Sequence, residues 1–192
     1  MRSLEDWELI ALVKQGNYEA FDCLVERYKN PIFTLCLYIT RNAQSAEDLV
    51  QETFIRLFRS LNRVKPQAQF KTFIFGIARN LALNQIRNEQ RKRNFLSRLL
   101  YKLNYDHKNQ SVNNPEIGVI NESKELVSVV QECMLELSPE HREILFLRET
   151  QGFDYESIAE TLGCRVGTVR SRLARARAQL RKKILEKGVV IK

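Results

Sequence analysis

The residues with the clearest chemical potential are arginines and lysines gathered in one segment. Residues 153–183 read FDYESIAETLGCRVGTVRSRLARARAQLRKK, and the second half of this segment contains no acid. Guanidinium groups bind phosphate through charge-assisted hydrogen bonds, so this concentration predicts contact with a polyanion such as nucleic acid. The basic residues are Arg165, Arg170, Arg172, Arg175, Arg177, Arg181, Lys182 and Lys183.

The spacing of this segment predicts two helices joined by a tight turn at Gly163, where a residue with positive φ is favoured. The second helix has an apolar stripe at Val166, Val169, Leu173, Ala176 and Leu180. At about 100° per residue, the residues that point away from this stripe are Gly167, Ser171, Ala174 and Arg175, with Arg170 on its flank. This side is small in the middle and cationic at its edges, which suits a helix that lies in a DNA major groove. Helix-turn-helix geometry also occurs in proteins that do not bind DNA, and an arginine-rich helix is often only a solvated face.

Charge is distributed unevenly along the 192 residues. The net charge is +8, yet residues 1–60 contain seven basic and nine acidic residues. This asymmetry predicts a polyanionic partner for the later part and a different partner for the beginning. Four cysteines form no CxxC pair, the two histidines lack ligand spacing, and no apolar run approaches the length of a membrane span. The N-terminus also lacks the basic start of a signal peptide, so we expect a cytoplasmic protein with reduced thiols.

Helical periodicity continues through the first part of the chain. Helices are expected over residues 4–13 and 18–39, the second kinked or split at Pro31. Ser45 is expected to cap the next helix in a capping box, with a core stripe at Ala46, Leu49, Val50, Phe54, Leu57 and Phe58. The other face presents Asp48, Gln51, Glu52 and Ile55. This face is either simply solvated, with Asp48 engaged in the cap, or it docks a basic partner surface with Ile55 as an apolar contact.

A second candidate nucleic-acid surface follows a loop over residues 62–71. A long helix is expected from about Thr72, and Asn80, Asn84, Arg87 and Arg91 share one of its sides. Asparagine is unfavourable inside helices, and asparagine and arginine read base edges, so this register favours nucleic-acid contact over a merely solvated face. Phe70, Lys71 and Phe75 are expected to offer stacking and phosphate contacts of the kind that single-stranded nucleic acid favours.

The pattern as a whole predicts an all-α protein of two small helical domains joined by a flexible linker. We place the domains at residues 1–94 and 123–192, the second a helix-turn-helix, with a linker at 95–122 that contains a short helix near Leu96–Leu103. Leu126 to Leu137 is expected to form one helix, and Ser138-Pro139 begins the next as a cap followed by proline at the first helical position.

Three segments resemble the extracytoplasmic-function group of bacterial sigma factors. AEDLVQETFIRLF (46–58) is similar to the helix that docks on the RNA polymerase clamp. FKTFIFGIARNLALNQIR (70–87) is similar to the minus-ten recognition and melting element, and residues 137–181 to the minus-thirty-five reader. The resemblance implies a sigma factor that binds core RNA polymerase and promoter DNA, has no catalytic site, cofactor or small-molecule substrate, and serves a stress response under an anti-sigma factor.

The resemblance also implies residue roles. Asp48, Gln51, Glu52 and Ile55 would contact the clamp of the largest polymerase subunit. The minus-ten contacts would be Asn62, Lys65, Phe70, Lys71, Asn80, Asn84, Arg87 and Arg91, the loop capturing a flipped base. Gly167, Arg170, Ser171 and Arg175 would face the minus-thirty-five groove, and Arg165, Thr168, Arg172 and Arg177 would hold phosphates. Phe73, Asn84 and Arg165 depart from a common tryptophan, aspartate and proline. Phe73 should preserve the packing, and Asn84 removes a negative charge near DNA, so the minus-ten preference should differ from that of typical members. Arg165, at the start of the recognition helix, adds a candidate phosphate or base contact.

Two other functions compete with this interpretation. A stand-alone regulator would use the helix-turn-helix as a dimer on a palindromic site, with a dimer seam or effector pocket in the first domain. A nucleic-acid enzyme would use Glu47, Asp48 and Glu52 to hold a metal. The sequence shows no phosphate-binding GxxxxGK[ST] loop and no histidine among these acids, which disfavours the enzyme.

Overall fold

The computed structural model describes residues 3–61, 69–102 and 122–188, with the side chains of 96–102 and 122–127 excepted, and every regular element in these ranges is helical. The elements are α1 (Asp6–Lys14), α2 (Tyr18–Thr40), α3 (Ala43–Ser60), α4 (Phe70–Lys102), α5 (Glu122–Leu135), α6 (Pro139–Leu145), the π-helical turn η2 (Phe146–Thr150), α7 (Tyr155–Leu162) and α8 (Val166–Glu186). The predicted all-α class is confirmed.

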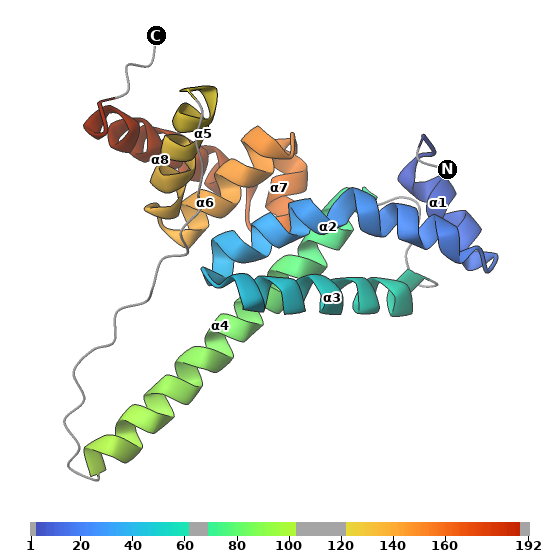
Figure 1. Cartoon of the computed structure of the whole chain (residues 1–192), viewed down its shortest axis with the longest axis horizontal. Helices are drawn as coiled ribbons and strands as arrows, with labels where there is room; N and C mark the ends of the chain where they lie inside the picture. The colour runs from blue at the N-terminus through green and yellow to red at the C-terminus, as the bar shows by residue number, and fades with distance from the viewer. Residues whose placement is uncertain (1–2, 62–68, 103–121, 189–192) are drawn as a thin grey trace.

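Helices α1 to α4 form the first domain (Figure 1). Helices α2, α3 and α4 pack against one another, and α1 packs on α2. Their facing sides bury Leu24, Ile32, Leu57 and Ile74 completely. Burying a large aliphatic side chain contributes about 1.5–3 kcal/mol, so this packing, more than local propensity, holds the short helices in place. The second half of α4 projects away from the other helices (Figure 1).

Helices α5 to α8 form the second domain and contain the predicted helix-turn-helix, α7 and α8. Gly163 ends α7 with φ of 63°, in the left-handed conformation expected from its position. Val169, Leu173 and Ala176 of α8 are buried, as their spacing predicted. Ser138 caps α6, and Pro139 occupies its first turn, which confirms the cap predicted from the sequence.

One predicted alternative, a split, is excluded at Pro31, and two other local features differ from the prediction. Pro31 lies inside α2 without splitting it, because residues on both sides of it, Leu24 and Leu35, are fully buried in the same core. Asn42, and not Ser45, caps α3: its side chain accepts a hydrogen bond from the Ser45 amide at 2.7 Å. The Ser45 hydroxyl is instead engaged by Gln85 of α4. Helix α4 continues to Lys102, so the residues expected to form a separate short helix belong to it as far as that residue.

The two domains pack directly against each other. Helix α2 contacts α6, and α4 contacts α7. At the centre of this contact, the Phe75 ring lies 5.3 Å from the Phe153 ring and 6.4 Å from the Phe146 ring, and Tyr38 also meets Phe146 edge-on at 5.5 Å. Buried residues of both domains therefore form one continuous apolar cluster.

The first turn of α7 generates a stability prediction. The Asp154 carboxylate accepts a hydrogen bond from the Ser157 amide at 2.7 Å, and this contact lowers the pKa of Asp154. Asp154→Ala should therefore lower the free energy of unfolding by about 0.5–2 kcal/mol, because the cap is lost. Asp154→Asn keeps the acceptor and should stay close to wild type. Chemical denaturation followed by circular dichroism measures both, and equal losses would contradict the capping role.

Candidate nucleic-acid and protein interfaces

The outward side of α8 is open to solvent. Gly167, Arg170, Ser171 and Arg175, the four residues expected to face the groove, are all exposed. A Cβ added to Gly167 would meet no described atom within 4 Å. Glycine inside a helix costs roughly 1 kcal/mol relative to alanine, and nothing in the described chain requires it here. An approaching partner surface would account for it.

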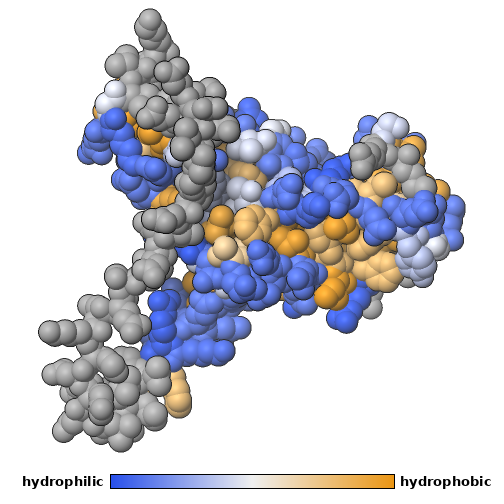
Figure 2. All heavy atoms as spheres, in the orientation of Figure 1, coloured by the Kyte–Doolittle hydropathy of each residue, from blue (hydrophilic) through white to orange (hydrophobic). Residues whose placement is uncertain are grey.

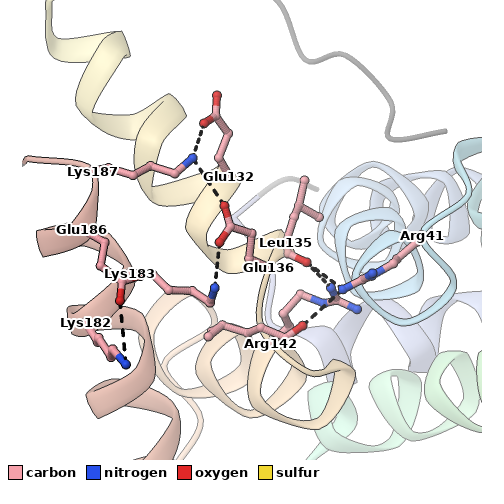
Figure 3. Close-up of polar contacts among 10 residues, drawn as sticks. Arg41, Glu132, Leu135, Glu136, Arg142, Lys182, Lys183, Glu186 and Lys187 are labelled. Carbon is pink, nitrogen blue, oxygen red and sulfur yellow. Dashed lines mark hydrogen bonds and ion pairs between the residues drawn. The ribbon is translucent and has the colours of Figure 1, made fainter. Parts of the chain in front are cut away.

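Acidic residues of the same domain already pair with several cations of α8. Arg177 forms an ion pair with Glu149 at 2.6 Å, and the hydrogen bond raises the pKa of Arg177. Lys183 is 2.7 Å from Glu136, whose pKa it lowers (Figure 3). These pairs are largely exposed and therefore weak, so phosphates can replace the carboxylates. Their effect is to concentrate unpaired positive charge toward the N-terminal half of α8.

The cations near the start of α8 differ in how they are held. Arg165 and Thr168 are exposed. The Arg172 guanidinium is 3.5 Å from Glu140, and its side chain is only 24% exposed, so it also fastens α8 to α6. The Arg170 guanidinium lies 5.9 Å from the centre of the Tyr155 ring. Sequence reasoning missed Tyr155 as a support for Arg170, because nothing in the spacing shows that α7 and α8 bring the two together.

The polar side of α4 is formed as predicted. Asn80, Asn84, Arg87 and Arg91 are all exposed, and the Arg87 guanidinium reaches the Asn84 side-chain oxygen at 3.5 Å. Gly76 begins the same side, one turn before Asn80, and a Cβ there would likewise meet no described atom within 4 Å. Sequence reasoning missed Gly76, although a glycine inside a long helix is an available signal.

The aromatic residues at the start of α4 do not have the expected position. Phe70 is 2% exposed and packs edge-on against Tyr28 at 5.5 Å and Trp7 at 6.0 Å. Phe75 is fully buried. Neither ring can therefore stack on a base in this conformation, because α1, α2 and the second domain cover them. Asn62 and Lys65 lie outside the described residues.

Lys71 is also engaged within the protein. Its ammonium donates a hydrogen bond to the Gln151 carbonyl oxygen and lies 5.0 Å from the centre of the Phe153 ring. Burial lowers the pKa of Lys71. The second domain thus engages the Lys71 ammonium group, which is not free for the predicted phosphate contact in this conformation.

The acidic side of α3 faces outward. Asp48 and Gln51 are exposed, Glu52 is half-buried and Ile55 is 45% exposed. Glu52 pairs with Arg56 one turn later at 2.6 Å. Such a pair on a helix surface contributes about 0.3–0.5 kcal/mol, so a partner cation can displace Arg56. Asp48 takes no part in the helix cap, which belongs to Asn42.

An exposed apolar patch adjoins this acidic side. Phe58, expected in the core, is 45% exposed and contacts Tyr18 and Phe21 of α2 with ring centroids 6.3 and 5.2 Å apart. Tyr18 is itself 67% exposed. Apolar surface gathers over α2 and α3 (Figure 2). An apolar patch beside charged residues is the usual anatomy of a protein–protein interface.

Other kinds of site are less well supported by the described residues. Among them, no three His, Cys, Asp or Glu side chains gather in a group that could hold a metal ion. The described helices include none that is both long and apolar enough to cross a bilayer. All four cysteines are free, and Cys36 and Cys133 are buried.

The fold defines a two-domain helical protein whose second domain contains a helix-turn-helix. Two family models match the chain: Sigma-70 region 2 over residues 24–92 and Sigma-70 region 4 over residues 128–180. The RNA polymerase sigma-H factor of Pseudomonas aeruginosa is 33% identical, with 93% of each chain covered. The sigma-E factor of Haemophilus influenzae is 35% identical, with 94% of this chain and 96% of that one covered.

The chain therefore belongs to the sigma-70 family, in its extracytoplasmic-function group, as the sequence predicted. Sigma factors are transcription initiation factors and not enzymes. Solved structures share the fold. RpoE of Bartonella quintana, in complex with the anti-sigma factor NepR, matches with a TM-score of 0.64 at 22% identity, covering 85% of this chain and 96% of that one. CnrH, in complex with the cytosolic domain of CnrY, matches with a TM-score of 0.63 at 23% identity, covering 96% and 99%.

The position of Phe70 generates a second prediction. Phe70→Ala should lower the free energy of unfolding by about 3–5 kcal/mol, the usual cost of removing a buried ring. Phe70→Leu keeps most of the buried volume and should cost much less. Thermal and chemical unfolding measure both. A fully stable Phe70→Ala protein would mean that the ring is exposed in solution, and base stacking would again be available to it.

Proposed function

We propose that the protein binds core RNA polymerase through α3 and guides it to promoters whose DNA is contacted by α4 and α8. The observation that carries this proposal is the separation of two kinds of exposed surface. The side of α3 presents Asp48, Gln51 and Ile55, whereas the outward sides of α4 and α8 present amides and guanidinium groups. The protein partner is thereby bound by one helix, α3, and the polyanionic partner by two others, α4 and α8.

The acidic side of α3 is suited to a basic helical surface such as the polymerase clamp. Asp48, Gln51 and Glu52 supply the polar contacts, and the apolar surface of Ile55 and Phe58 supplies area that is removed from water on binding. The charges orient the encounter, and the apolar area contributes most of the affinity.

The two DNA-facing helices divide the promoter between them. The small exposed side of α8 allows its backbone close to the base edges of the minus-thirty-five duplex, where Arg170 and Arg175 reach guanines or phosphates. On α4, Asn80, Asn84 and Arg87 supply hydrogen bonds to the opened minus-ten strand. No covalent bond is made or broken, so binding energy alone opens the duplex.

Regulation is proposed from the same surfaces. A protein that works with RNA polymerase acts in the cytoplasm, and an anti-sigma factor would silence it by covering the α3 side or the DNA-facing helices. RpoE of Bartonella quintana, which shares the fold, is bound to the anti-sigma factor NepR in its solved structure.

The polymerase contact is tested with Gln51→Ala/Glu52→Ala. The double variant should lose roughly tenfold or more in affinity for core RNA polymerase, because it removes polar groups at the centre of the docking side. The matched control is Gln15→Ala/Glu19→Ala, which removes the same two side-chain types from exposed positions at the end of α1 and the start of α2. Gel filtration and fluorescence anisotropy with purified core measure binding. Failure of the wild-type protein to co-elute with core would overturn the proposal.

The DNA contact is tested with Arg170→Ala, Arg175→Ala and Arg177→Ala. Loss of a base-reading arginine should cost about 1–3 kcal/mol, concentrated at one or two promoter positions. Arg177→Ala should weaken all sequences alike, since a phosphate contact carries no sequence information. Holoenzyme binding to a library of promoter variants separates the two patterns, and a uniform loss for Arg170→Ala and Arg175→Ala would show that they only hold phosphates.

A further inference from the structure

A buried ion pair joins the two domains. The Arg79 guanidinium of α4 lies 2.5 Å from the Glu143 carboxylate of α6, with side chains that are 16% and 4% exposed. Two more polar contacts lie in the same seam: Ser157 donates to the Gln69 side-chain oxygen at 3.0 Å, and Lys71 donates to the Gln151 carbonyl oxygen. Every one of these contacts connects Gln69 or the first ten residues of α4 to the second domain.

Arg79 and Glu143 depend on each other, because either residue alone would be a buried charge without a partner. Burial raises the pKa of Glu143, and Arg79 acts against that rise by favouring the ionised carboxylate. Removing one partner of a buried pair leaves an uncompensated charge, which is far more costly than losing an exposed pair. Arg79 and Glu143 thus act as a specific fastening between the domains.

Arg142, next to Glu143, disfavours the packing of the two domains against each other, which we call the closed arrangement. Figure 3 shows Arg142 beside Arg41. Arg142 is fully buried and donates one hydrogen bond to the Leu135 carbonyl, while its Nε and Nη2 atoms have no hydrogen-bond partner among the described residues. Arg41, the residue that follows α2, donates to the same carbonyl at 2.8 Å. Burial and the charge of Arg41 lower the pKa of Arg142 to about 10. The seam therefore combines a favourable buried ion pair, Arg79–Glu143, with two like-charged arginines, Arg41 and Arg142. Arg142 has two buried nitrogen atoms without hydrogen bonds.

The closed arrangement is incompatible with promoter binding. The minus-ten and minus-thirty-five elements are about 25 base pairs apart, or roughly 85 Å at 3.4 Å per base pair. Two domains that share a core cannot reach both, so they must separate when the polymerase-bound protein engages a promoter. Separation frees Lys71 and Arg79. Arg79 directly precedes Asn80 in α4 and lies about 100° around the helix from it, so it flanks the DNA-facing side.

We propose that Arg79 is a further minus-ten DNA contact, which Glu143 masks in the free protein. In the closed protein the guanidinium binds the carboxylate of the second domain. In the open protein it binds a phosphate of the minus-ten strand, since both are oxyanions that accept the same charge-assisted hydrogen bonds. This inference rests on the proposed function of α4.

The test measures shape and DNA binding in the free full-length protein. Glu143→Gln should weaken the closed arrangement, increase the radius of gyration in small-angle X-ray scattering, and tighten binding of a fluorescein-labelled random 20-nucleotide single-stranded DNA by roughly tenfold. The matched control is Glu160→Gln, which removes the same charge from an exposed position on α7 and should leave both readouts at the wild-type level. Unchanged scattering and DNA affinity for Glu143→Gln would overturn the proposal.

Arg79→Gln separates opening from DNA contact. It should open the protein as Glu143→Gln does but gain little or no affinity for the DNA, because the new contact is missing. An equal gain in affinity would show that Arg79 does not touch DNA. The exchanged variant Arg79→Glu/Glu143→Arg should restore closure without restoring DNA binding, and it keeps the test valid if a single variant folds poorly.

These outcomes are distinct from failure of the proposed function. The scattering and oligonucleotide measurements need no polymerase, whereas the proposed function fails if the wild type does not bind core. A wild type that binds core, together with a Glu143→Gln protein that behaves like wild type in the free state, would overturn the masking alone.

Discussion

The limited circumference of helix α4 is the constraint on which the rest of the structure depends. One side of α4 supplies Ile74, Phe75 and Ala78 to the core, and another side must stay exposed with Asn80 and Asn84. Burial of apolar side chains is favourable, so the aromatic residues Phe70 and Phe75 pack in the core. What remains on the exposed side is amide and guanidinium groups, the side-chain types that form hydrogen bonds with base edges.

Helix α8 solves a similar problem with charge. Its buried stripe attaches it to α6 and α7, and its cations are divided between those that pair with acids of the protein and those that stay exposed. Glu136, Glu140 and Glu149 pair with the cations that also fasten α8 to its own domain. Arg170 and Arg175 extend from the exposed side instead. The division leaves a narrow cationic edge around a small, open helix surface, which favours contact in a groove over general attraction to any polyanion.

The two domains share a core, and in our proposal the breaking of this shared core regulates access to α4. Phe75, Phe146 and Phe153 bury apolar area only while the domains touch, yet a sigma factor has to span two promoter elements. In the proposed open form, binding to polymerase and DNA offsets the energy of this contact. A seam with a buried ion pair and an incompletely satisfied Arg142 is specific in geometry without being maximally stable, as a reversible contact requires.

The sequence alone determined the class, the helix-turn-helix and the outward-facing registers, because a helical period of 3.6 residues fixes which side chains share a face. Gly163, the stripe of Val169 and Leu173, and the exposed positions of Asn80 and Asp48 all follow from that local geometry. Only the tertiary structure decided what covers each face. It buried Phe70, exposed Phe58, and paired Arg79 with Glu143, which is distant in the chain. Periodicity within one helix carries no information about which other helix lies against it, because that choice is made by packing between segments far apart in sequence.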